Sequence, residues 1–210
     1  GGDGLRGGAA RLGLTGAAWR VIGPAALCFA LGFFTKQTLL AAPLAVGLCL
    51  LLARPLVGVA FGLLYLALVL IPFGLLDLAT RGGFYQHIVA FHSSWGAHDF
   101  LRLWEPFVAR YWPLLLAGAA LPLAILGTAL ARRHLAALRA DPDLLPATYF
   151  LTAALFSLGA GTHGGNHNHF VETVVVAVFC AALLAGRLLG GAAGRPAPGG
   201  PAPAARAALA

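Results

Sequence analysis

Long apolar runs separated by short polar segments make up most of the chain. A helix that crosses a bilayer needs roughly 20 apolar residues, and the runs that approach this length lie in two groups, one on each side of a long polar connection. The pattern predicts six transmembrane helices with soft edges, at about 17–34, 37–53, 56–78, 111–131, 144–160 and 170–188.

The composition supports an integral membrane protein. Hydrophobic residues make up 60% of the chain, charged residues only 10%, and the mean hydropathy is +0.84, well above the value for soluble globular domains. We therefore expect an all-α, polytopic membrane helix bundle over residues 1–188. Residues 189–210 are rich in Gly, Pro and Ala and cannot bury enough apolar surface to order themselves, so we expect a disordered tail there.

The start of the sequence indicates a piece of a longer protein, and its basic residues indicate a bacterial origin. The chain begins with Gly, contains no Met and shows no apolar segment typical of a signal peptide near its start, so we expect a piece of a longer protein. One Lys stands against thirteen Arg, and Gly and Ala are abundant, as in proteins from GC-rich bacterial genomes. The expected location is the bacterial plasma membrane.

The basic residues also predict an orientation, because short cytoplasmic loops accumulate Arg and Lys. With the N-terminus in the cytoplasm, ten basic residues lie inside and four outside. The segment "ARRHLAALR" at 131–139 is the strongest anchor, since its loop is short and carries three arginines. The four outer residues are Lys36, Arg81, Arg102 and Arg110.

Under this topology the polar segments gather on the outer face. They are the "TKQ" turn after the first span, the connection at about 79–110, and the turn "THGGNHNHFVE" at 162–172. Three helices run inward from this face, so their N-termini and unsatisfied amide groups point at it and favour an anion. Thr35 is a candidate N-cap for the second helix, and Asn166 or Asn168 for the sixth. A phosphate group suits this geometry.

Lys36, Gln37 and Glu172 are the candidate binding residues that the apolar pattern isolates most clearly. Lys36 is the chain's one lysine and stands in a tight turn; the alternative is an interfacial lysine that extends to water. Burying the Gln37 side chain at the start of an apolar helix costs free energy unless its amide group has a hydrogen-bond partner. Glu172 lies about one turn inside the sixth helix, where a carboxylate is usually paired or functional; the alternative is stabilisation of the helix dipole.

Three histidines in seven residues, His163, His167 and His169, raise a zinc hypothesis. We do not favour it, because His167 and His169 project to opposite sides of an extended chain and the turn contains no Cys. Asn166, Asn168 and His169 instead resemble hydrogen-bonding groups for a polar head group, although a polar loop in the interfacial zone would look the same. No metal and no cofactor are expected.

The outer connection mixes aromatic residues with His and Arg. Phe84, Ile88, Phe91 and Trp95 recur at three- and four-residue spacing, which predicts an amphipathic helix lying in the membrane interface. Trp95 and the aromatic residues that follow it fit the belt that such residues form at membrane surfaces.

Three segments carry a family resemblance. "LGFFTKQTLLAAPLAVGLCLLLARP" at 31–55, "GGFYQHIVAFH" at 82–92 and "GGNHNHFVE" at 164–172 resemble, in this order, motifs of bacterial multi-spanning glycosyltransferases of the GT-C class. These enzymes are relatives of the protein O-mannosyltransferases and the aminoarabinose transferases. The resemblance covers about 31–172.

The resemblance implies transfer of a sugar from a polyprenyl-phosphate-type lipid donor on the extracytoplasmic face. It implies donor phosphate binding by Lys36, with Gln37, Asn166, Asn168, His169 and Glu172 positioning phosphate, sugar or acceptor. The class carries its catalytic acid in the outer loop after the first span; this chain has no matching loop, so we assign no catalytic residue and expect the acid upstream. Expected partners are the lipid-linked donor and membrane lipids, with no nucleic acid. A transporter and a non-catalytic scaffold subunit are the alternatives.

Overall fold

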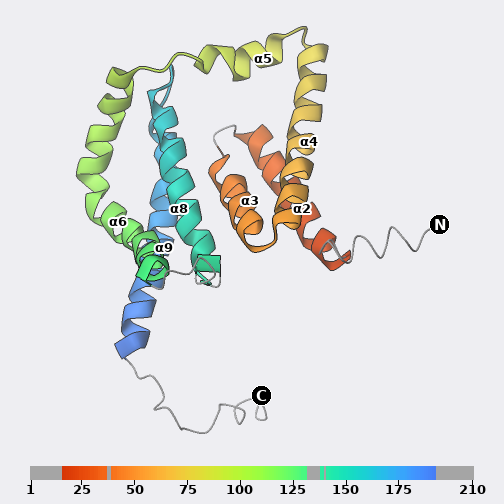
Figure 1. The fold of residues 1–210 in the computed structure, drawn as a ribbon. Coiled ribbons are helices and arrows are strands. Elements are labelled where there is room, and N and C mark those ends of the chain that lie inside the picture. Colours follow the sequence, from red (N-terminus) through yellow and green to blue (C-terminus); the bar gives the residue numbers. More distant parts are fainter. Residues whose placement is uncertain (1–15, 37–38, 132–137, 140, 193–210) are drawn as a thin grey trace, which may run out of the picture.

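The computed structural model describes residues 16–36, 39–131, 138, 139 and 141–192, and every regular element in this part of the chain is a helix (Figure 1). The predicted all-α membrane bundle is therefore confirmed. The elements are α2 (Gly16–Thr35), α3 (Ala41–Ala53), α4 (Pro55–Ala79), α5 (Gly83–Ile88), η1 (Ala90–His92), α6 (Ala97–Ala131), α8 (Leu144–Phe156), η2 (Ser157–Gly161), η3 (His167–Phe170) and α9 (Val171–Ala192).

Five helical segments are long and apolar enough to cross a membrane, counting only the described residues. Four of them match predicted spans closely at both ends, and the fifth, α6, starts well before its predicted edge at 111. The exception is α3, which has 13 residues where the apolar pattern predicts a span over 37–53. At 1.5 Å per residue it is about 20 Å long, against a hydrocarbon core of about 30 Å. The five segments are Ala18–Thr35, Pro55–Ala79, Ala97–Ala131, Leu144–Gly161 and His167–Leu189.

The short helix α3 forms a tight antiparallel hairpin with α4. A Cβ atom at Gly58 would lie 2.8 Å from the Cα of Leu51, and one at Gly47 would touch the ring of Phe61. Continuing this register places the start of α3 beside the middle of α4, about 11 residues and roughly 16 Å before the end of α4 at Ala79. The start of α3 therefore lies deeper in the bundle than the end of α4 at Ala79, as Figure 1 also shows.

Two helix groups make up the bundle. The first packs α2 and α3 against α4, and the second packs α6 and α8 against α9. Contact between α3 and α8 joins them: the Oγ1 of Thr152 in α8 donates a hydrogen bond of 3.0 Å to the carbonyl oxygen of Ala41 at the start of α3. Within the second group, Gly118 lets α6 approach the backbone of α9 at Ala177, the close contact that small residues allow between membrane helices.

The outer connection differs from the prediction. Helix α5 runs across one end of the bundle (Figure 1), as expected for an interfacial helix. The helical part of this connection ends with η1 at His92, so Trp95 lies outside the predicted amphipathic helix. Trp95 pairs with Thr162 in an isolated β-bridge, and its Nε1 donates a hydrogen bond of 2.9 Å to the carbonyl oxygen of Leu158. The connection is thereby fixed to η2.

Helix α6 begins at Ala97 rather than near residue 111. Its 35 residues span about 52 Å. Leu103 and Phe107 in its first turns are buried against Ala160 and Phe170, and this packing explains why a segment with four charged residues is helical.

An ion-pair cluster lies at the opposite end of the bundle. The guanidinium of Arg187 in α9 contacts Asp141 and, at 2.7 Å, Asp143 just before α8. These two ion pairs fix the end of α9 to the start of α8. The predicted disordered tail begins at residue 189, whereas α9 continues to Ala192; the rest of that tail, 193–210, lies outside the described residues.

The predicted orientation can be tested with single cysteines in a variant whose three native cysteines are replaced by alanine. His98 is 91% exposed near the outer connection, and Arg139 is exposed near the opposite end. We expect a membrane-impermeant thiol reagent to label His98→Cys in intact cells and Arg139→Cys only after permeabilisation. The reverse pattern would contradict a cytoplasmic N-terminus.

Candidate functional site

Two motifs that lie far apart in the sequence meet at one small cavity. The first supplies Lys36 and Leu39, and the second supplies Asn168, His169, Val171 and Glu172; Phe156 at the end of α8 completes the lining. The volume is about 40 Å³, enough for a few water molecules or the edge of a phosphate group but not for a sugar. Four of the predicted binding residues, Lys36, Asn168, His169 and Glu172, are brought together here.

Lys36 follows directly on the last residue of α2, and its side chain is half-buried. Its backbone N–H donates to the carbonyl oxygen of Gly32 at 2.8 Å, and its own carbonyl accepts from Leu39 at 3.0 Å. The ammonium group has no hydrogen-bond or ion-pair partner within the described part of the chain. Lys36 therefore presents an unpaired positive charge to the cavity.

The predicted N-cap at Thr35 is wrong. Thr35 ends α2 rather than beginning α3, because its Oγ1 donates back to the carbonyl oxygen of Leu31 at 2.9 Å. The residue before α3 is Leu40, which has no side-chain cap. The first turn of α3 contains Pro43, which has no N–H, and the fully buried Ala41, and neither residue lines the cavity beside Lys36. Gln37, the other residue predicted for this turn, lies outside the described residues.

Asn166 caps the helix that leads into α9, as predicted. Its side-chain oxygen accepts a hydrogen bond of 2.8 Å from the backbone N–H of Asn168 and so starts η3, which continues directly into α9. Asn166 itself is exposed and does not line the cavity, and its predicted contact with a substrate stays a prediction. Asn168 is exposed at the cavity edge.

His167 and His169 lie on different sides of the turn, although the segment is the helix η3 and not the extended chain that the prediction assumed. His169 lines the Lys36 cavity, and its ring lies so close to Gly159 that a Cβ atom there would be 2.9 Å from Nδ1. His167 lies on the other side of η3, with its ring edge against Phe170. Among the described residues, no group of three or more His, Cys, Asp or Glu side chains is placed to bind a metal ion.

Glu172 has a partner that the sequence does not reveal. The Tyr149 hydroxyl in α8 donates a hydrogen bond of 2.8 Å to Oε1 of Glu172, and both side chains are half-buried. Glu172 lies in the first turn of α9 and close enough to Lys36 for their charges to interact. Tyr149 stands in an apolar span, and its hydroxyl is the one signal that could have pointed to it.

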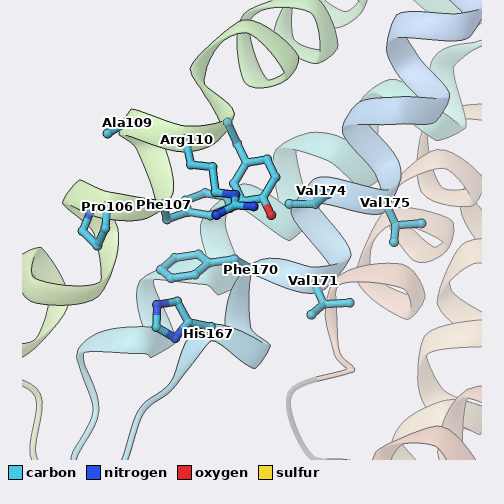
Figure 2. Close-up of a pocket in the computed structure, with 10 residues that line it drawn as sticks. Pro106, Phe107, Ala109, Arg110, His167, Phe170, Val171, Val174 and Val175 are labelled. Atoms are coloured by element: carbon cyan, nitrogen blue, oxygen red, sulfur yellow. The ribbon is translucent and has the colours of Figure 1, made fainter.

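A larger groove of about 850 Å³ lies on the opposite side of the same turn, between α6 and α9. Its walls are aromatic and aliphatic, and the rings of Phe107 and Phe170 stack at 4.1 Å. Figure 2 shows Phe170 between Arg110 and His167, which with Tyr111 are the polar side chains that line the groove. Val171 lines both the groove and the Lys36 cavity, so this residue lies between the two spaces. The groove is within the size range of ligand pockets and suits a hydrocarbon chain.

The comparisons with known proteins give no relative from which to transfer a role. No protein-family model, no curated protein and no solved structure matches the chain. A functional assignment therefore depends on the motifs and on the geometry of the cavity and groove.

Proposed function

We propose that this protein binds a polyprenyl-phosphate-type lipid and forms the donor-binding part of a membrane glycosyltransferase that works on the extracytoplasmic face. One observation carries the proposal: a lysine with no ion-pair partner among the described residues lines a small cavity, and a large apolar groove lies on the other side of the turn before α9, with Val171 lining both. A lipid phosphate combines these two requirements, since it has an anionic group on a hydrocarbon chain.

Each part of the ligand has a matching part of the site. The phosphate lies against Lys36, whose positive charge stabilises the negative charge that grows on a departing phosphate. The hydrocarbon chain follows the groove between α6 and α9. The cavity is too small for a sugar, so the transferred sugar projects from it toward the outer end of the bundle. Sugar transfer itself is inferred from the motif resemblance.

A transporter is the second candidate, and the position of α3 favours it. A short helix that begins inside the span and directs its N-terminus at an anionic group is a common feature of transporter binding sites. Such a protein would accept an anion from water, whereas the proposed enzyme takes its phosphate from the membrane.

A photo-crosslinkable polyprenyl-phosphate probe in nanodiscs tests the proposal. We expect crosslinks at the groove residues Phe170 and Val174, abolished by excess unlabelled polyprenyl phosphate but not by inorganic phosphate or by a neutral polyprenol. Competition by inorganic phosphate alone would support the transporter. Labelling that no competitor reduces would leave a scaffold subunit and contradict both binding functions.

A further inference from the structure

Lys36 and Glu172 line the same cavity without forming an ion pair. Their charges interact, yet no Lys–Glu contact within 4 Å occurs between them in the described part of the chain. Opposite charges attract strongly in a half-buried site, because the effective dielectric constant is lower than in water. At the other end of the bundle, Arg187 contacts Asp141 and Asp143 directly. Something must therefore keep Glu172 away from Lys36.

Tyr149 is the group placed to do so. Its hydroxyl donates a hydrogen bond of 2.8 Å to Glu172 Oε1, and Tyr149 is absent from the cavity lining, so it binds the carboxylate from the protein side. One helical turn further along α8, Thr152 donates to the carbonyl oxygen of Ala41. The same face of α8 thus positions both the carboxylate and the start of α3, the helix that follows the Lys36 turn.

We propose that Tyr149 is a positioning residue whose hydrogen bond holds Glu172 away from Lys36 and leaves the ammonium group available to a lipid phosphate. This inference rests on the proposed function for the identity of the anion. Without the tyrosine hydroxyl, the carboxylate turns toward Lys36 and competes with the phosphate. The hydrogen bond from Tyr149 therefore controls how strongly the Lys36 ammonium group attracts the phosphate of the ligand.

The first readout needs no ligand, because Lys36 is the one lysine of the chain and amine acylation at a side chain reports on it alone. Acetic anhydride labelling of the full chain in nanodiscs is followed by mass spectrometry. We expect Tyr149→Phe to slow the acylation of Lys36 severalfold, because an ion pair with Glu172 stabilises the unreactive ammonium form. The double variant Tyr149→Phe/Glu172→Gln should recover the rate.

The second readout is the affinity for farnesyl phosphate, a short polyprenyl monophosphate. We expect Tyr149→Phe to weaken binding about tenfold, since a half-buried ion pair must then be broken. The double variant should bind as well as Glu172→Gln alone. A tyrosine that acts only by packing predicts equally weak binding in Tyr149→Phe and in the double variant. Tyr85→Phe and Glu105→Gln, at exposed positions outside the cavity, are the matched controls.

The two readouts separate failure of this inference from failure of the proposed function. An acylation rate in Tyr149→Phe equal to that of the wild type would overturn the positioning role of Tyr149, whatever the ligand. Persistent slow acylation in the double variant would overturn it as well. Wild-type protein that does not bind farnesyl phosphate would contradict the lipid-phosphate proposal, while the acylation rates still decide the role of Tyr149.

Discussion

Lys36→Gln is expected to weaken the binding of a polyprenyl-phosphate probe by roughly ten- to a hundredfold, the equivalent of about 1.5–3 kcal/mol. The ammonium group is half-buried, faces the cavity and has no partner among the described residues that could replace the ligand. Glutamine keeps most of the length of the side chain and removes the charge. Binding is measured by competition with the photo-crosslinkable probe.

Lys36→Arg provides the second arm of this experiment. A planar guanidinium does not fit a cavity of about 40 Å³ as a compact ammonium does, so we expect a partial loss. A lysine that merely extends to water predicts instead that Arg substitutes freely and Gln costs little. Arg102→Gln, an exposed position on α6 outside both the cavity and the groove, is the control. Unchanged binding in Lys36→Gln would remove its phosphate role.

The apolar pattern predicts the fold well where one helix fills one apolar run. Helix α4 extends over Pro55–Ala79 against a prediction of 56–78, because its length is set by the hydrophobic segment itself. The pattern fails where packing sets the boundary. Helix α3 begins only at Ala41, which α8 contacts through Thr152. A local sign of that boundary is Pro43, which stands in the first turn, where a helix tolerates proline.

For α3 the predicted helix is too long, whereas for α6 it is too short. Its first turns carry charged residues, so a hydropathy window excludes them. Leu103 and Phe107 nevertheless face Ala160 and Phe170 once the helix is placed beside η2 and α9. That contact joins residues more than 50 positions apart, and the local sequence does not contain it.

The candidate site could be predicted in part, because polar residues stand out in an apolar chain. Lys36, Asn168, His169 and Glu172 meet as their motifs suggest. Of the two predicted caps, Asn166 is the one that starts η3, and this selection depends on the backbone of the turn. The Tyr149 hydroxyl stands out in an apolar span, but its pairing with Glu172 depends on how α8 and α9 pack and could not be predicted from the sequence.

Gly161→Ala is expected to lower the free energy of unfolding by about 1–3 kcal/mol, the usual cost of overpacking. A Cβ atom at this position would collide with the indole Nε1 of Trp95 and lie 2.9 Å from the Cβ of Phe100. The indole cannot simply move aside, because its Nε1 donates to the carbonyl oxygen of Leu158 and its backbone pairs with Thr162. Thermal unfolding followed by tryptophan fluorescence measures the effect.

Two further variants test whether the collision with Trp95 causes the loss of stability in Gly161→Ala. Gly127→Ala on α6 meets open space and should be neutral or slightly stabilising, as alanine is in a helix. Trp95→Ala removes the indole but leaves the contact with Phe100, so Gly161→Ala should cost less in that background than in the wild type. Additive losses in the double variant would show that the collision with Trp95 is not the cause. A Gly161→Ala protein as stable as the wild type would contradict the close attachment of the outer connection to η2, on which the position of the turn before α9 depends.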